Sequence, residues 1–324
     1  MRRTGRDTRG RRLPRTAMRL VAVIACVGAA KAVGPQGRIV YRALEFGADE
    51  VVNVYMVDAN GSNQHALVDD QTAFTAMWSG DGRVAAWLNK DDALFTMNAD
   101  GTGRQRVPDG GYPRDWSTDG EWFATVHNTR GPGVDVAKRR ADGSDYQMLT
   151  DERFGHINSI EWSRDGRKLV FSARAGGGAR QDVYSVGADG RGLTNLTNHA
   201  LPNYDEHWSA DGQSIYFVSQ RDPGIGIYVM EADGSNVRRV APDRGVGHLL
   251  AVSPDGKYLL IDGADLHVLD TDGAHVSQVT DDDLWPRRAD WYIPRSILSV
   301  SPLGTHSGYW GWLKTLRQPG LQTP

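Results

Sequence analysis

The sequence contains a single cysteine, Cys26, among 324 residues. One cysteine excludes a disulfide framework and any metal site built from several cysteines. Long apolar runs are also missing: Leu20 to Ala30 is only eleven residues long, whereas a membrane-spanning helix needs about 20. We therefore expect no transmembrane span.

The sequence lacks the short motifs of several enzyme classes. It has no G-x-S-x-G, no G-x-x-x-x-G-K-[ST] and no H-E-x-x-H. Gly224-Ile225-Gly226 and Gly245-Val246-Gly247 both lack the third glycine of a dinucleotide fingerprint. The absences argue against an α/β-hydrolase, a P-loop nucleotidase, a zincin protease and a Rossmann dehydrogenase.

Acidic residues outnumber basic ones beyond the N-terminal segment. The first 32 residues hold nine basic residues and one acid, so removing them takes the net charge from −3 to −11. Such an acidic body argues against a nucleic-acid partner, whose binding would rest on basic contacts to phosphate.

Residues 1–32 have the layout of a secretory signal peptide: an arginine-rich head, a short apolar run and a small-residue end. Ala30-Lys31-Ala32 offers a cleavage site. Val23-Ile24-Ala25-Cys26 also resembles a lipobox, so lipidation at Cys26 stays an alternative, as does an uncleaved anchor or a start at Met18. We expect an exported protein, periplasmic or extracellular, either free or lipid-anchored.

Two motifs alternate along the chain. Trp-Ser-x-Asp-Gly begins at Trp78, Trp116, Trp162 and Trp208, and a fifth copy has Val252 in place of the tryptophan, at steps of 38, 46, 46 and 44 residues. The second motif is an apolar run that ends in Ala-Asp-Gly or a close variant. Its glycines are Gly61, Gly101, Gly143, Gly190, Gly234 and Gly273.

Each repeat of about 40 to 45 residues predicts four short strands, named a to d along the chain. Asp-Gly between β-rich runs is typical of a hairpin turn, because glycine and aspartate tolerate the positive φ that tight turns need. Units of this length with four strands are propeller blades. The sequence therefore predicts an all-β, six-bladed propeller of antiparallel blades, with seven blades as a minor alternative.

The closure of the ring is also predicted. The first unit lacks strand a, and a spare tryptophan-bearing segment, Ala289–Tyr292, follows the sixth unit. We expect this C-terminal strand to complete the first blade, because a closed ring leaves no open edge. A rival closing strand is Ile297–Ser301. The domain boundaries are 1–32 for the signal peptide, 33–294 for the propeller and 295–324 for a C-terminal tail of unassigned role.

The paired motifs resemble the TolB-type β-propeller repeat, a relative of WD-repeat blades. Met230 to Asn236 (Met-Glu-Ala-Asp-Gly-Ser-Asn) is particularly similar to it. The resemblance covers roughly residues 37–292 and implies an exported, non-enzymatic platform for protein interactions in the cell envelope. TolB itself carries an α/β domain before its propeller, so the resemblance is to stand-alone members of this repeat class.

Successive strands of a blade run in opposite directions. The tight Asp-Gly turns of the a–b and c–d connections therefore lie on one face of the propeller, and the longer b–c and d–a loops lie on the other. Function tends to reside on variable loops held by a rigid scaffold, so we expect the long-loop face to bind a partner. Its candidate residues are His127, Arg174, Arg180 and Arg221.

The innermost strands of a propeller line its channel. Residues just before the motif tryptophan or its equivalent include Asp115, Glu161, His207 and Asp290, and Asp205 lies on the same side of its strand as His207. We expect these five residues to form an acidic ring with one histidine. One interpretation is a hydrated channel whose charges interact with the backbone and with solvent. The alternative is a ligand-binding site.

We expect a monomeric binding protein with no catalytic residues. The predicted partner is an envelope protein or peptide, and no cofactor is required. The alternative is a carbohydrate-binding or metal-dependent polysaccharide-active propeller, in which His207, Glu161, Asp115 or Asp205 acts as base or metal ligand and a divalent cation occupies the channel.

Overall fold

The structure is a computed structural model that describes residues 34–45, 51–68, 73–88, 93–108, 112–128, 133–151, 154–176, 178, 180–222, 224–240, 247–273, 276–281 and 284–294. The chain divides into two compact units, residues 1–33 and 34–324. The predicted signal peptide, Cys26, the rival closing strand and the tail all lie outside the described residues.

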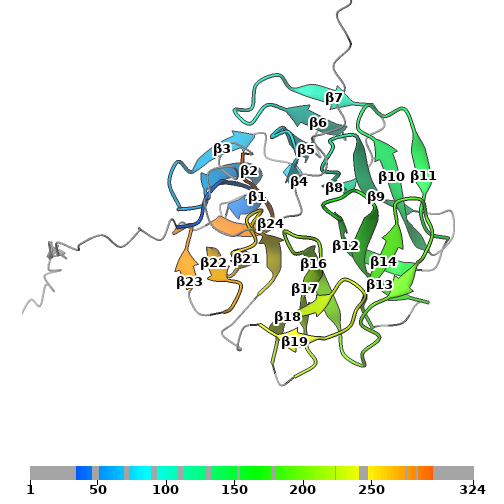
Figure 1. Cartoon of the computed structure of the whole chain (residues 1–324). Coiled ribbons are helices and arrows are strands. Elements are labelled where there is room, and N and C mark those ends of the chain that lie inside the picture. The colour runs from blue at the N-terminus through cyan, green and yellow to red at the C-terminus, as the bar shows by residue number, and fades with distance from the viewer. Residues whose placement is uncertain are drawn as a thin grey trace, which may run out of the picture. The chain divides into compact units, whose positions relative to one another are not determined.

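The described residues form 24 strands, arranged around a central axis (Figure 1). Blade 1 contains, from the axis outward, β24 (Leu284–Tyr292), β1 (Arg38–Glu45), β2 (Val51–Asp58) and β3 (His65–Val68). Blade 2 contains β4 (Ala73–Trp78), β5 (Val84–Leu88), β6 (Ala93–Met97) and β7 (Gln105–Val107). Blade 3 contains β8 (Pro113–Trp116), β9 (Trp122–Asn128), β10 (Val134–Arg140) and β11 (Tyr146–Met148).

The second half of the ring repeats this pattern. Blade 4 contains β12 (Phe154–Trp162), β13 (Lys168–Ala175), β14 (Asp182–Gly187) and β15 (Thr194–Asn195). Blade 5 contains β16 (Asn203–Trp208), β17 (Ser214–Ser219), β18 (Gly226–Glu231) and β19 (Arg238–Arg239). Blade 6 contains β20 (Leu249–Val252), β21 (Tyr258–Asp262), β22 (Leu266–Asp270) and β23 (Val276–Gln278).

All strand pairs are antiparallel, as the repeats predicted. Blades 3 and 4 are joined into one eight-stranded sheet by a single pair, Val134 opposite Phe154. The prediction of an all-β propeller is confirmed, and the described strands make six blades rather than seven. Within the described residues, no helix is long and apolar enough to span a membrane.

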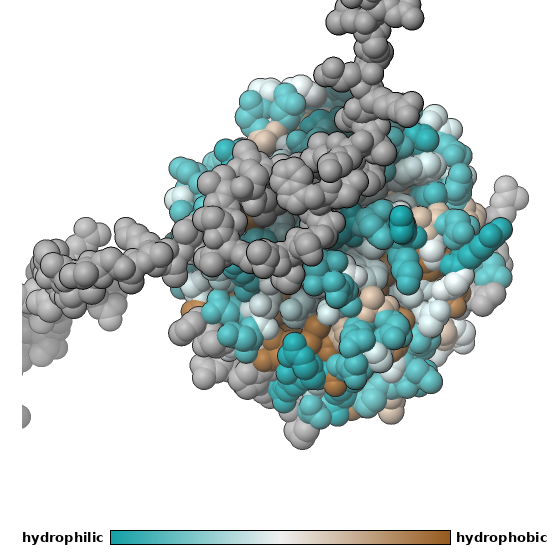
Figure 2. All heavy atoms as spheres, viewed as in Figure 1, coloured by the Kyte–Doolittle hydropathy of each residue, from teal (hydrophilic) through white to brown (hydrophobic). Residues whose placement is uncertain are grey.

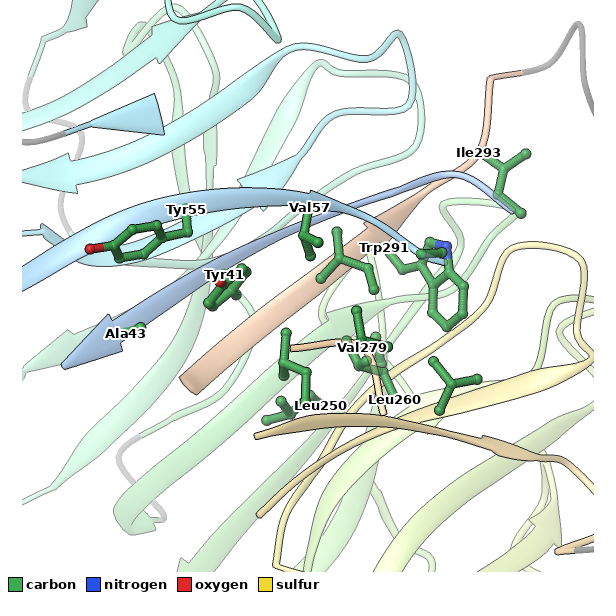
Figure 3. Close-up of a cluster of buried hydrophobic side chains, with 14 residues drawn as sticks. Tyr41, Ala43, Tyr55, Val57, Leu250, Leu260, Val279, Trp291 and Ile293 are labelled. Atoms are coloured by element: carbon green, nitrogen blue, oxygen red, sulfur yellow. The ribbon is translucent and has the colours of Figure 1, made fainter. Parts of the chain in front are cut away.

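The predicted closing segment forms the end of β24. β24 pairs with β1 over its length, and Asp290 lies opposite Val40. The indole N–H of Trp291 donates to the Gln36 carbonyl at 2.8 Å, and the indole is buried against Leu260 and Val279 of blade 6 (Figure 3). The last strand therefore joins the two ends of the ring through both hydrogen bonds and apolar packing.

The motif tryptophans are core residues. Trp78, Trp116, Trp162 and Trp208 are each at most 5% exposed, and their clusters combine residues of two consecutive blades. The Trp208 cluster, for example, includes Val170 of blade 4. Large aromatic side chains dominate core energetics, so the tryptophans hold adjacent blades together.

The a–b turns share one network of side-chain hydrogen bonds. In the turn after β12, the Ser163 hydroxyl donates to Asp165 at 2.7 Å and accepts the backbone N–H of Lys168 at 2.9 Å. Gly166 then adopts a φ of +69°. The motif Ser-x-Asp-Gly is thus explained by local turn chemistry, since serine and aspartate satisfy the turn and glycine supplies the positive φ.

Candidate functional site: the central channel

A cavity of about 520 Å³ lies along the axis of the propeller, lined mainly by the innermost strands. All six residues that precede the motif tryptophan or its equivalent line it: Met77, Asp115, Glu161, His207, Ala251 and Asp290. Asp205 lines it as well. The structure therefore brings together all five predicted channel residues. On the face shown in Figure 2, hydrophilic residues predominate among those described.

The channel carboxylates reach across blade junctions. The backbone N–H of Trp78 donates to Asp290 at 2.7 Å, that of Trp162 to Asp115 at 2.6 Å, and that of Trp208 to Glu161 at 3.0 Å. In each case the acceptor belongs to the innermost strand of the preceding blade. These acids therefore have a structural role that the sequence did not reveal, because it depends on contacts between residues 47 positions apart in two cases and 212 in the third.

Two of these carboxyl groups resist ionisation. Burial raises the pKa of Asp115 well above its usual range, and the nearby charges of Glu161 and Asp290 raise it further. Burial is also the main cause that raises the pKa of Asp290. In both groups burial therefore favours the protonated, uncharged form.

His207 has the opposite behaviour. Burial alone would lower its pKa, but Glu161, at 3.1 Å from Nδ1, together with Glu206 and Asp205, raises the pKa of His207 to about 9. At neutral pH this histidine is therefore a cation paired with a carboxylate.

Asp205 occupies an irregular part of β16. Its φ is +53°, and the register between β16 and β17 shifts between Tyr204 and His207. Its carboxylate lies 2.6 Å from Nδ1 of His248, which precedes β20 of the next blade. Asp205 is therefore a further inter-blade contact as well as a channel residue.

Four arginines that line the channel were missed by the sequence analysis: Arg42, Arg114, Arg164 and Arg288. Arg114 directly precedes Asp115, so strict alternation along the strand places its side chain on the opposite side. A β-bulge between Pro113 and Asp115 breaks the alternation, and another bulge in β24 includes Arg288, whose φ is +42°. A bulge has no reliable sequence signal here, so the side of the strand on which these arginines lie could not be predicted.

The four predicted loop residues do not join the channel group, since none of them lines the cavity. Arg180 pairs with Asp182 at 3.0 Å. Arg221 stacks over the rings of Phe217 and Tyr228. These two arginines anchor the ends of their own loops.

The other two loop residues lie in strands. His127 belongs to β9, and its ring centroid is 5.6 Å from that of Tyr146. Arg174 is paired with His156 near the end of β13. Whether any of the four contacts a partner stays a prediction.

Among the described residues, no group of three or more histidine, cysteine, aspartate or glutamate side chains is arranged to hold a metal ion. The divalent cation considered from the sequence therefore gains no support from the channel geometry.

Residues 152–284, which comprise blades 4 to 6, match the TolB beta propeller domain family. The chain therefore contains TolB-like β-propeller repeats. The uncharacterized protein Atu1656 of Agrobacterium fabrum is 25% identical over 202 residues, covering 60% of this chain and 66% of that protein. The Tol-Pal system protein TolB of Geobacter sulfurreducens is 41% identical over 63 residues, 19% of this chain and 14% of that protein. The matched regions thus span less than two thirds of these relatives.

Solved structures confirm the TolB-like propeller fold. TolB from Acinetobacter baumannii superposes with a TM-score of 0.67 at 16% identity, covering 79% of this chain and 66% of that one. A putative TolB from Agrobacterium tumefaciens has a TM-score of 0.59 at 18% identity, covering 80% and 100%. An oligogalacturonate lyase in complex with manganese has a TM-score of 0.53 at 14% identity, covering 76% and 86%. Such low identities show the fold alone, because one propeller fold hosts many functions.

Proposed function

We propose that this TolB-like propeller is a non-enzymatic, exported binding protein of the cell envelope, which holds a partner protein or peptide at the loop-side mouth of its channel. The observation that carries the proposal is the use of the channel acids as inter-blade hydrogen-bond acceptors. A catalytic base must be free to take a proton from its substrate. The acceptors Asp115, Glu161 and Asp290 are instead already occupied by backbone N–H groups.

The proposed location rests on two properties of the fold. The ring is closed by β24, which completes blade 1, so the propeller is a rigid platform. The b–c and d–a connections vary in length from blade to blade, whereas the a–b turns repeat one hydrogen-bonding pattern. A variable surface on a rigid scaffold favours selective binding.

The envelope location and partner class rest on the family and on the N-terminal sequence. A relative that matches part of this chain is named a Tol-Pal system protein, and residues 1–32 have the pattern of a secretory signal. A monomer with a single-chain closed ring is the simplest assembly for this role, and lipidation at Cys26 is the alternative to a free form.

A pull-down with crosslinking from an envelope extract of the native host tests the proposal. The comparison protein has residues 174–181 replaced by Asn-Gly. Because Ala173 already lies opposite Asp182, a two-residue turn preserves the register of β13 and β14. A matched control is Arg167→Gln, which changes an 85%-exposed side chain on an a–b turn of the opposite face.

We expect a protein that is captured by the native chain and by Arg167→Gln, is lost with the shortened loop, and binds again when purified. Absence of any such protein would refute the adaptor role. A polysaccharide-active propeller is the weaker alternative, because the described residues contain no metal-binding cluster. Turnover of polygalacturonate by the native chain, abolished in His207→Ala, would establish it instead.

A further inference from the structure

Arg42, Arg114 and Arg288 come from β1, β8 and β24 and line one level of the channel. Strands β8 and β24 both run toward the a–b turns, so residues early in these strands lie nearer the long-loop mouth. Arg114 and Arg288 precede the ring acids Asp115 and Asp290. The channel therefore has an arginine layer toward the long loops and an acid ring deeper inside.

The positive charges of two of these arginines have few hydrogen-bond acceptors or carboxylates of the protein around them. The Nε of Arg114 is buried and has no hydrogen-bond partner among the described residues. A nitrogen of Arg288 donates to the Asn158 carbonyl at a long 3.5 Å. Among the described residues, neither arginine has a carboxylate within 4 Å, and Asp205, the acid that acts on Arg288, is already paired with His248.

The electrostatics agree with this geometry. Burial lowers the pKa of Arg114 with no acid offsetting it. Burial and repulsion by Arg114 and Arg42 lower the pKa of Arg288 to about 10, so both of these guanidinium groups are close enough to repel that of Arg288. Burying the charges of Arg114 and Arg288 without a carboxylate partner is costly, and two such arginines are expected where a ligand supplies the missing negative charge.

We propose that Arg42, Arg114 and Arg288 form an anion site that binds a carboxylate of an acidic segment in the partner polypeptide. This inference rests on the proposed function. A guanidinium group presents two parallel donors that match a carboxylate.

A peptide fits both layers of the channel better than a free phosphate does. A multiply charged phosphate would be repelled by the Glu161 carboxylate further in. A peptide places a single carboxylate among the arginines and extends an uncharged backbone toward the acids.

Titration of the full chain with two fluorescein-labelled hexapeptides tests the site. One is (Gly-Glu)₃ and the other is (Gly-Gln)₃, both with an amidated C-terminus, so the second peptide has no carboxylate in its side chains or at its end. We expect binding of the glutamate peptide alone, weakened at least tenfold in Arg114→Gln and in Arg288→Gln. Arg191→Gln is the matched control, because this side chain is 90% exposed on a c–d turn of the opposite face, and it should bind like the native chain.

Equal binding of the glutamine peptide, or an equal loss in Arg191→Gln, would overturn the site. Binding of inorganic phosphate or digalacturonate without binding of the glutamate peptide would overturn the peptide source. Thermal unfolding of Arg114→Met separates binding from structure: a ligand site predicts an unchanged or higher Tm, and a lower Tm would mean that Arg114 is structural and refute the proposal.

The two proposals fail in different ways. If Arg114→Gln still captures the envelope partner at native strength, the arginine site is wrong and the adaptor role stands. If the glutamate peptide binds but no partner is captured, the anion site stands and the adaptor role fails.

Discussion

One carboxylate oxygen of Glu161 lies 3.1 Å from Nδ1 of His207 and also accepts the backbone N–H of Trp208 at 3.0 Å. The other ring nitrogen of His207, Nε2, lies 3.2 Å from the carbonyl oxygen of Leu249. Both nitrogens therefore face acceptors, which only a protonated imidazole can satisfy with two donors. This contact chain joins blades 4, 5 and 6 along the channel wall.

Because of that pairing, we expect the stability of the propeller to fall in alkaline solution. The pKa of His207 is about 9 in the folded protein and about 6.5 in an unfolded chain. The folded state binds the extra proton, so the stabilisation is complete below about pH 6.5 and is lost as the pH rises through 9. At about 1.4 kcal/mol for each pH unit between the two pKa values, the loss is up to about 3 kcal/mol.

Chemical denaturation between pH 6 and 10, with Glu161→Gln as comparison, measures this contribution. The glutamine can still accept the Trp208 N–H but cannot hold the imidazolium, so the variant should be less stable than the native chain at pH 6 and similar at pH 10. NMR titration should show the pKa of His207 falling to 6.5 or below. An unchanged pKa in the variant would contradict the pairing.

Glu206→Gln is expected to stabilise the protein above neutral pH. Glu206 is fully buried, and burial raises its pKa to about 7 despite a hydrogen bond from the Ser159 hydroxyl at 2.8 Å. The unfolded chain ionises near pH 4.5, so ionised Glu206 opposes folding and stability falls between about pH 4.5 and 7. We expect Glu206→Gln to gain about 1 to 3 kcal/mol at pH 8 and little at pH 4.

Urea denaturation at these two pH values measures the gain. Glu121→Gln is the control, because its side chain is 55% exposed and its change should stay within about 0.5 kcal/mol at both pH values. A gain that is equal at pH 4 and pH 8 would show that ionisation is not the cause.

Two Asp-Gly glycines should differ in their tolerance of alanine. Gly166 of an a–b turn has a φ of +69° with nothing within 4 Å of an added Cβ, so Gly166→Ala should cost only the backbone strain, about 1 to 2 kcal/mol. Gly234 of a c–d turn has a φ of +89°, and an added Cβ would lie 2.7 Å from the Leu196 carbonyl of the preceding blade. We expect Gly234→Ala to cost clearly more, because the two blades must separate. Thermal or urea unfolding of both variants measures the loss of stability. Equal losses would show that the close approach of Gly234 to the Leu196 carbonyl does not add to the cost.

The sequence by itself determined the fold class, the number of blades and the strand that closes the ring. These follow from local chemistry repeated along the chain: Asp-Gly fixes each turn, Ser and Asp satisfy it, and β-rich runs of fixed spacing leave one four-stranded arrangement. The first unit lacks strand a, and Ala289–Tyr292 carries the tryptophan that is typical of such a strand. These two facts were sufficient to place Ala289–Tyr292 in blade 1.

Only the tertiary structure decided what the channel residues do. The alternation of side chains correctly placed Asp115, Glu161 and Asp290 inside, but their backbone partners belong to other blades and have no signature near them in the chain. Arg114 was hidden by a β-bulge, which reverses the side of the strand on which a residue lies. The inter-blade hydrogen bonds therefore arise from the packing of neighbouring blades, and the arginine layer arises from the closure of the ring, which brings Arg42 and Arg288 to the same channel as Arg114.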